Sequence, residues 1–527
     1  MADIVIINPR FDVSYWGLEH AMPFLGSKAI LPVASLPLLA ALTPPPHAVT
    51  LIDENVEAID FERCARADIV GITGMNVQRA RMHEILAELK RRACFTVVGG
   101  PWVTVKEDDI AGLADVIFIG EAEETWPRFL TEWGQGRHAR RYEQAERTNM
   151  ASVPPPRLDL LRMKDYGLGS VQFSRGCPFE CEFCDIIVTF GRRPRIKTSA
   201  QVLAELDGLR ATGKRTVFIV DDNLIGNKRA IKPILREVIA WQEAHGHPLM
   251  FATEASIDLA DDPELMRLMV DAGVSELFVG IETPNEASLR ETKKLQNLRA
   301  RGGSMLDKVH RIQEAGMEVW CGMIVGFDND GEDIFAAQRR FISESRIVNA
   351  MINMLVAIPR TPLYHRLERE GRLDNSDDPA GFGPFGTNVI PLRMGRQVLR
   401  DGYVELMREL YSPTAFFHRV DALYLEARLR WGRARQHYLR RHPLRRAKLN
   451  ARLLAEAVAI FLMLMRGVPD PALRREYRRR LLRAVWRRPA PAILQLYAIK
   501  CALHFHFHTM VLAMQSTPRP VALGAAA

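Results

Sequence analysis

The sequence predicts an α/β fold with a doubly wound N-terminal domain, a second series of strand–helix units, and a mainly helical C-terminal region. Two observations predict the first two parts: short Val- and Ile-rich runs alternate with segments of helical length, and these runs end in glycine or polar residues. A third observation separates the last part, because long Arg-rich helical stretches replace this pattern after residue 390. We expect domains at residues 1–150, 151–390 and 391–527.

The N-terminal domain is predicted from five apolar runs with helix-length segments between them, such as Val77–Arg92. Continuous apolar strands joined by right-handed crossovers form a parallel sheet that is covered on both faces, as in a flavodoxin-like domain. The five runs are Ile4–Asn8, Val49–Asp53, Ile69–Thr73, Phe95–Gly99 and Val116–Gly120.

Small residues lie at the carboxyl ends of three of these runs. Doubly wound sheets bind their ligands at that edge. Glycine lets a backbone approach a flat or phosphate-bearing ligand closely. No G-x-G-x-x-G motif follows the first run, which argues against a dinucleotide site and leaves the ligand open at this point. The candidate ligand residues are Thr73, Gly74, Gly99, Gly100 and Gly120.

Composition excludes several classes of protein. With 527 residues, 47% hydrophobic and 25% charged, the chain is neither disordered, collagen-like nor a coiled coil. Seven cysteines are too few for a disulfide scaffold in a chain of this length. The first twenty residues contain Asp3, Asp12 and Glu19 rather than a basic, apolar signal peptide, so we expect a reducing cytoplasm.

The C-terminal region is strongly basic. Residues 401–527 contain 23 Lys and Arg but 8 Asp and Glu, a local charge of +15, which leaves −7 for residues 1–400. Arginines flank Leu and Trp in residues 478–488, which suits an anionic membrane surface, nucleic-acid phosphates or a solvated helical face. Because no RNA-binding motif with stacking aromatics accompanies them, we favour peripheral contact with the inner face of the membrane over nucleic acid.

No segment of the sequence is expected to span a membrane. Leu453–Met465 is apolar but short and contains Glu456, and Ala492–Met514 is interrupted by Lys500 and three histidines. The histidines, His504, His506 and His508, have no carboxylate neighbour, so we do not expect a metal site there.

Three cysteines with the spacing C-x3-C-x2-C predict the chemical centre of the protein. Cys177, Cys181 and Cys184 can each bind one iron of a [4Fe–4S] cube and leave the fourth iron open to another ligand. A structural zinc site is the main alternative, but it needs a fourth Cys or His, and the next twenty residues supply neither. A ferredoxin would also supply a fourth cysteine. Cys64, Cys94, Cys321 and Cys501 are expected to be small apolar residues of the interior.

The cysteine loop, which follows the apolar strand Ser170–Phe173, resembles the signature of radical S-adenosylmethionine (SAM) enzymes. In that family the open iron binds the methionine part of SAM, and one-electron reduction from an external donor produces a 5′-deoxyadenosyl radical. The resemblance implies a partial (β/α)6 barrel over residues 151–390. The following runs fit its strands: Thr216–Val220, Leu249–Ala252, Leu277–Val279, Val319–Val325 and Met351–Ile358.

The same resemblance implies SAM-binding residues at the ends of these strands, where barrels collect their chemistry. Asp221 and Asp222 match the motif that contacts the methionine amino group, while Glu254 and Glu282 resemble residues that hold the carboxylate side or the ribose. Residues 322–326, with Gly322 and Gly326 at the two ends, are similar to the glycine motif near adenine. An acidic residue at such a position can alternatively be a helix cap or an ion-pair partner.

A doubly wound domain directly before such a barrel resembles the cobalamin-dependent class of radical SAM enzymes. The resemblance implies that the corrin lies on Thr73, Gly74, Gly99 and Gly100, with Gly120 near the nucleotide tail. The D-x-H-x-x-G motif that supplies a cobalt ligand in other cobalamin proteins is absent, and His20 and His83 are not expected to replace it.

The class implies methylation of an unactivated carbon in a small-molecule or lipid substrate. Residues 14–20, 99–104, 172–187 and 220–227 resemble the subgroup that includes the hopanoid C-2 methylase, which makes a membrane lipid the leading substrate hypothesis. One alternative keeps both cofactors but performs ring formation, oxidation or C–C coupling. An alternative of another class is a membrane-associated redox sensor that uses the cluster without turnover.

Overall fold

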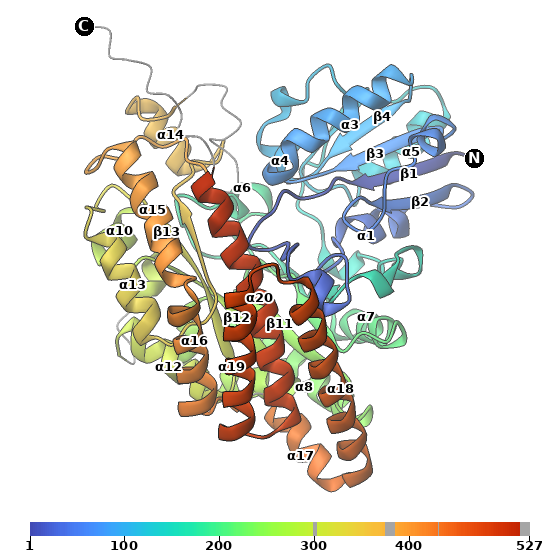
Figure 1. The fold of residues 1–527 in the computed structure, drawn as a ribbon. Coiled ribbons are helices and arrows are strands. Elements are labelled where there is room, and N and C mark those ends of the chain that lie inside the picture. Colours follow the sequence, from blue (N-terminus) through green and yellow to red (C-terminus); the bar gives the residue numbers. More distant parts are fainter. Residues whose placement is uncertain (299–302, 375–384, 431, 517–527) are drawn as a thin grey trace, which may run out of the picture.

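The structure, a computed structural model, describes residues 1–298, 303–374, 385–430 and 432–516. Figure 1 shows a doubly wound N-terminal part, a second open sheet with helices outside it, and long C-terminal helices that run beside that sheet. The predicted α/β fold class is therefore confirmed.

The N-terminal sheet has six parallel strands in the order β2-β1-β3-β4-β5-β6. Alternate residues of β1 enter different cores: Ile4 and Ile6 pack on one face of the sheet, and Val5 and Ile7 on the other. This alternation explains the continuous apolar run. The strands are β1 (Asp3–Asn8), β2 (Ala48–Asp53), β3 (Ile69–Thr73), β4 (Thr96–Gly99), β5 (Val116–Ile119) and β6 (Arg141–Glu143), the last of which was not predicted. The helices are α1 (Ser35–Leu42), α2 (Phe61–Ala65), α3 (Arg79–Arg91), α4 (Pro101–Val105) and α5 (Thr125–Gly134).

The second sheet contains six parallel strands in the order β14-β13-β12-β11-β10-β7, which is the chain order of a partial barrel. Its helices cover the outer face, where Leu277 and Val279 of β12 are fully buried, while Phe278 between them points to the inner face. The strands are β7 (Gly169–Val171), β10 (Thr216–Ile219), β11 (Met250–Glu254), β12 (Val274–Glu282), β13 (Glu318–Val325) and β14 (Ala350–Met354). The helices are α7 (Ser199–Ala211), α8 (Lys228–Ala244), α9 (Pro263–Ala272), α10 (Glu286–Glu291), α11 (Leu295–Leu298), α12 (Met305–Ala315), α13 (Ile334–Glu344) and α14 (Pro362–Arg369).

The C-terminal helices pack on the barrel. In α20, Lys500 forms an ion pair with Glu318 at the start of β13 (2.6 Å) and lies over the Trp320 ring. The helix therefore contacts the inner side of the sheet at the amino end of β13. The helices are α15 (Arg396–Leu410), α16 (Pro413–Asp421), α17 (Arg433–Arg441), α18 (Pro443–Gly467), α19 (Pro471–Arg487) and α20 (Pro491–Ser516).

None of the described helices combines the length and the apolar character that a membrane crossing needs. The histidines of α20 have protein partners: a His504 ring nitrogen lies 2.7 Å from the Tyr477 hydroxyl, and a His506 ring nitrogen lies 2.9 Å from the Ser14 carbonyl oxygen. These side chains are buried parts of the helix packing.

Candidate active site

The cysteine loop, residues 176–185, lies between the short strand β8 (Ser174–Arg175) and helix α6 (Ile186–Thr189). Antiparallel pairing of β8 with β9 (Arg195–Ile196) closes the base of this loop. Gly176 has φ +98°, and a Cβ there would lie only 3.0 Å from the Gly191 carbonyl oxygen. Glycine is thus required immediately before Cys177, where the chain turns sharply.

Two amide side chains face the cysteine sulfurs. Gln296 Nε2 lies 3.4 Å from the Cys181 sulfur, and Asn223 Nδ2 lies 3.9 Å from the Cys177 sulfur. Among the described residues, no three Cys, His, Asp or Glu side chains converge on one single-ion position. A cube does not require such convergence, because each cysteine binds a different iron. Three free thiols on one loop, with amide donors beside them, fit a [4Fe–4S] cluster.

The two aspartates after β10 have different surroundings. Asp221 accepts hydrogen bonds from the Phe173 amide (2.7 Å) and the Ser174 hydroxyl (2.6 Å), so both of its oxygens have partners at the base of the loop. Asp222 accepts one bond from the Gly176 amide (2.6 Å), and its other oxygen has no hydrogen-bond partner within the described part of the chain. Burial raises the pKa of Asp221 to about 7 and that of Asp222 to about 6. Asp222 is therefore better placed than Asp221 to contact a ligand.

Glu254, the last residue of β11, also has a carboxylate with no hydrogen-bond or ion-pair partner in the described ranges. Strand register places it beside Phe278 of β12, on the inner side of the barrel. Burial, followed by the negative charge of Asp222, raises the pKa of Glu254 to about 8. A carboxyl group in this state is ready to bond an amino or hydroxyl group of a ligand.

Glu282 ends β12 at an irregularity of the strand and has φ +65°, which is strained for a residue other than glycine. Its carboxylate forms an ion pair with Lys294 (2.6 Å). A Cβ at Gly280 would lie 2.4 Å from that carboxylate, so glycine at this position leaves room for the pair. The strained backbone at this strand end therefore positions a charged pair inside the barrel.

Lys294 was not anticipated from the sequence. Burial opposes its charge, but the attraction of Glu282 and then of Cys181 raises the Lys294 pKa above its ordinary value. The ammonium also lies over the ring of Phe183, within the cysteine loop. The available signal for Lys294 in the sequence was the polar stretch 291–297, which contains it and follows the strand that ends at Glu282.

The two barrel glycines make room for side chains. A Cβ at Gly322 would lie 3.0 Å from the ring of Phe278. Gly326 has φ +100°, and a Cβ there would lie 2.9 Å from Leu399 of α15. Gly322 thus lies beside the interior of the barrel, whereas the packing at Gly326 involves the C-terminal helices.

The predicted glycine-rich edge of the N-terminal sheet is present. Gly100 has φ +106°, and a Cβ there would lie 2.8 Å from the Thr73 hydroxyl and from the Gly74 backbone, so the ends of β3 and β4 meet closely. Gly120, at φ +78°, has open space where a Cβ would be, and its amide donates to Thr104 (3.0 Å). The edge faces the barrel, because α4 beside it packs against α6, directly after the cysteine loop.

A buried ion network joins this edge to the cysteine loop. Arg175, two residues before Cys177, contacts Glu121 (2.5 Å) and Glu123 (2.7 Å), and Arg195 contacts Glu121 from the other side (2.9 Å). Burial alone would raise the pKa of Glu121, but the Arg175 charge lowers it below its ordinary value. The network was missed because nothing in the sequence pairs residues some fifty positions apart.

Comparison with known proteins assigns the two α/β domains to known families. Family profiles match residues 30–130 as a B12 binding domain, residues 171–341 as the Radical SAM superfamily and residues 361–518 as a domain of unknown function (DUF4070). An uncharacterized methyltransferase of Synechocystis is 41% identical over 80% of this chain and 78% of that protein. The Hopanoid C-2 methylase of Rhodopseudomonas palustris is 34% identical over 79% of this chain and 78% of that protein. The chain belongs to the cobalamin-dependent radical SAM methyltransferase family.

A solved structure supports the fold of this methyltransferase. The cobalamin-dependent SAM radical enzyme OxsB, with aqua-cobalamin and SAM bound, aligns with a TM-score of 0.62 over 94% of this chain and 83% of that chain, at 14% identity. The cofactors of the methyltransferase are a [4Fe–4S] cluster, SAM and cobalamin. The zinc and non-catalytic sensor hypotheses are thereby set aside.

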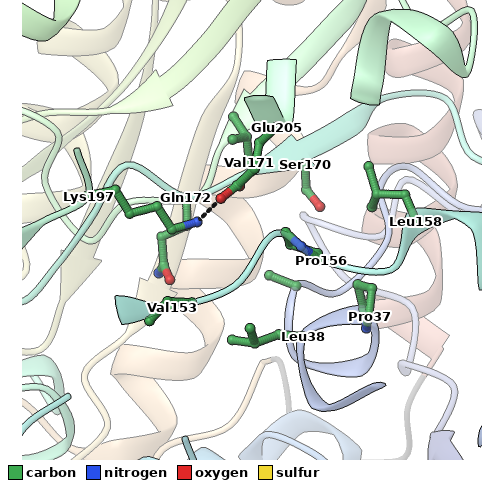
Figure 2. Close-up of a pocket in the computed structure, with 11 residues that line it drawn as sticks. Pro37, Leu38, Val153, Pro156, Leu158, Ser170, Val171, Gln172, Lys197 and Glu205 are labelled. Carbon is green, nitrogen blue, oxygen red and sulfur yellow. Dashed lines mark hydrogen bonds and ion pairs between the residues drawn. The ribbon is translucent and has the colours of Figure 1, made fainter. Parts of the chain in front are cut away.

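The methyltransferase has a small pocket at the junction of its two α/β domains. Figure 2 shows Pro37 and Leu38 of α1 on one side and the β7 residues Ser170 and Val171 on the other. The buried pair Lys197–Glu205 lines a further side. The pocket is mostly apolar, and its charged groups already have partners.

Proposed function

We propose that this enzyme methylates an unactivated carbon of a polycyclic membrane lipid, such as a hopanoid. The observation that carries the proposal is the joining of the glycine-lined edge and the cysteine loop by the Glu121–Arg175 network. Under this proposal the network keeps the corrin-binding edge next to the cluster loop, as a methyl transfer between two cofactors and one substrate requires. Similarity to the Hopanoid C-2 methylase supports the lipid class.

The residues divide into three groups under this proposal. Cys177, Cys181 and Cys184 hold the cluster, and the edge formed by Thr73, Gly74, Gly99, Gly100 and Gly120 receives the corrin. The unpaired oxygens of Asp222 and Glu254 bind polar groups of SAM, with Glu282 held beside them by Lys294. Asp221 supports the loop rather than the ligand, since its oxygens have protein partners.

When bound, the cofactors supply a carbon-based radical and a methyl group. The chain's own task is to orient the substrate between them and to exclude water from the radical. Contacts across the domain junction, including the hydrogen bond from Arg360 to the Thr104 carbonyl (2.8 Å), keep the two domains together.

The test is anaerobic reconstitution with iron, sulfide and cobalamin, followed by incubation with SAM, a reductant and a simple hopanoid. We expect 5′-deoxyadenosine together with a hopanoid that is heavier by one methyl group, measured by mass spectrometry. Formation of 5′-deoxyadenosine with a ring-closed, oxidised or coupled product would overturn the methylation proposal. Lipid profiles of cells with and without the protein provide the matching comparison in vivo.

We also propose that the C-terminal helices bind the inner membrane surface peripherally. Trp486 of α19 and Leu444 of α18 are each 86% exposed. Leu454, Val458 and Leu462 form an exposed stripe along α18, with Arg452 and Arg466 beside it. Tryptophan and leucine among arginines suit the boundary between anionic headgroups and acyl chains.

Vesicle co-sedimentation tests the membrane proposal on the full chain. We expect binding to vesicles containing phosphatidylglycerol, weaker binding to purely zwitterionic vesicles, and a loss of at least fivefold in the double variant Leu444→Ala/Trp486→Ala. Leu392→Ala, at an exposed leucine outside these helices, is the control. Unchanged vesicle binding by the double variant, or preferential binding of RNA by the wild type, would refute the proposal.

A further inference from the structure

The segment Ser14–His20 belongs to the N-terminal part of the chain but is held by the other two parts. The Tyr15 hydroxyl donates to the Ile352 carbonyl of β14 (2.7 Å) and lies 3.0 Å from the Tyr403 hydroxyl of α15. The His20 amide donates to His506 of α20 (3.2 Å). The segment therefore connects barrel and C-terminal helices, a role that the doubly wound domain does not need.

Local geometry makes the segment a tight turn. The Glu19 carboxylate accepts a bond from the Ser14 amide, and a Cβ at Gly17 would lie only 1.6 Å from that carboxylate. A larger residue directly after Trp16 would therefore displace the Glu19 side chain from this bond. Ser14, Tyr15 and Glu19 all make hydrogen bonds, whereas the indole of Trp16 extends from the turn without a hydrogen-bond partner in the described ranges.

Trp16 lies inside the mouth of the barrel. Its ring centroid is 4.8 Å from that of Phe278 on β12 and 6.1 Å from that of Phe218 on β10. We call these three side chains the aromatic wall. Trp16 is nevertheless 42% exposed, so one side of the indole faces open space above the inner surface of the sheet.

The aromatic wall lies next to the polar groups of the site. Glu254 is the register partner of Phe278, and Gly322 leaves room for the Phe278 ring. The wall itself offers ring faces and edges to that space and no charged group. Its chemistry suits a rigid hydrocarbon skeleton, which gains from apolar contact and requires no ion pair.

We propose that Trp16, supported by Phe218 and Phe278, is a specificity-determining residue that binds the fused hydrocarbon rings of the substrate. The inference rests on the proposed function and adds a residue and a surface to it. It also assigns a task to the helices matched as a domain of unknown function: Tyr403 and His506 fix the turn that carries Trp16.

The experiment measures lipid affinity directly on the anaerobic holoenzyme in detergent micelles, by equilibrium binding of a radiolabelled hopanoid. We expect Trp16→Ala to weaken hopanoid binding at least tenfold and Trp16→Phe to weaken it no more than threefold, because phenylalanine keeps a ring. SAM affinity should remain within twofold in both variants. Trp133→Ala, at a tryptophan packed on Phe95 in the N-terminal domain, is the matched control.

A second readout is the ratio of methylated lipid to 5′-deoxyadenosine, which should fall in Trp16→Ala because a loosely held substrate lets cleavage proceed without transfer. Thermal unfolding of each variant verifies folding. Equal hopanoid affinity in Trp16→Ala and wild type, or a loss of SAM affinity in place of lipid affinity, would overturn the assignment of Trp16 alone. A wild type that methylates no hopanoid would instead refute the proposed function, and the ring-binding role would fall with it.

Discussion

Two buried lysine–glutamate pairs lie at opposite ends of the barrel strands, and their difference shows where the chemistry is. Lys500 and Glu318 lie at the amino end of β13, each 3% exposed, with the Tyr424 hydroxyl and the Asn349 amide also bonded to Glu318. Lys294 and Glu282 lie at the carboxyl end of β12, beside the cysteine loop. Both pairs have the same 2.6 Å separation.

The surroundings of the two pairs differ. Around Lys500, the Tyr424 hydroxyl and the Asn349 amide also bond to the Glu318 carboxylate, as expected for a structural ion pair, and no cysteine lies among these partners. Around Lys294, the backbone of Glu282 is strained, and nearby acids such as Glu254 have no protein partner. Backbone strain and the neighbouring cysteine loop therefore distinguish the Lys294–Glu282 pair from the structural pair at the other end of the strands.

The largest effect is expected from the cysteine loop itself. Cys181→Ala should leave fewer than four irons per chain after reconstitution and abolish SAM cleavage, because two thiolates hold a cube poorly. Cys321→Ala, at a fully buried cysteine of β13, is the control and should keep its iron. Iron and sulfide analysis with visible absorption measures the difference. A full cluster in Cys181→Ala would show that other residues are the ligands.

The next largest effect concerns the Lys500–Glu318 pair at the amino end of β13. Lys500→Met should destabilise the apoprotein by about 3–5 kcal/mol, because it leaves the Glu318 charge buried without its counter-ion. Cluster content after reconstitution should be unchanged, since Lys500 lies at the far end of the strands. Denaturant unfolding of the apoprotein measures the first effect. A loss of iron with unaltered stability would contradict the structural role.

Lys294→Met should change the reduction potential of the cluster more than the stability of the fold. A cation beside the cysteine loop stabilises the more negative, reduced cluster, so its removal should lower the midpoint potential by tens of millivolts. Lys293→Met, at the neighbouring and more exposed lysine paired with Glu182, is the control. Redox titration followed by electron paramagnetic resonance measures the shift. An unchanged midpoint potential would show that Lys294 serves only as the ion-pair partner of Glu282.

The smallest effect is a pH dependence from Glu254. Its folded pKa of about 8 lies above the ordinary value of 4.5, so the folded apoprotein retains a proton that the unfolded chain loses. Its contribution to stability is therefore complete below pH 4.5 and is lost as the pH rises towards 8. Glu254→Gln removes this loss, and its melting temperature should exceed that of wild type by several degrees at pH 8 but less at pH 6. An advantage that does not grow with pH would contradict the raised pKa.

Local patterns predicted most of the fold. The runs ending at Thr73 and Val325 coincide with β3 and β13 at those ends, because apolar periodicity and terminal glycines are local signals. Strand β6 was missed, since Arg141 and Glu143 are exposed at a sheet edge and leave only Tyr142 as an apolar signal.

The candidate site was predicted only in part. The cysteines and the strand-end acids are recognisable from spacing and resemblance, but their roles remain predictions. Partners such as Arg175 with Glu121, or Trp16 with Phe278, depend on how distant segments meet. Such contacts arise from tertiary packing, and no local periodicity encodes them.

The bonds between Ser14, His20 and His506 impose an order on biosynthesis. They join positions that are 492 and 486 residues apart, so they form only after helix α20 has left the ribosome. The doubly wound domain can fold while translation continues, but the turn that carries Trp16 lacks its His506 bonds until α20 has been synthesised. A chain truncated before α20 would lack the His506 bonds that hold this turn against the C-terminal helices.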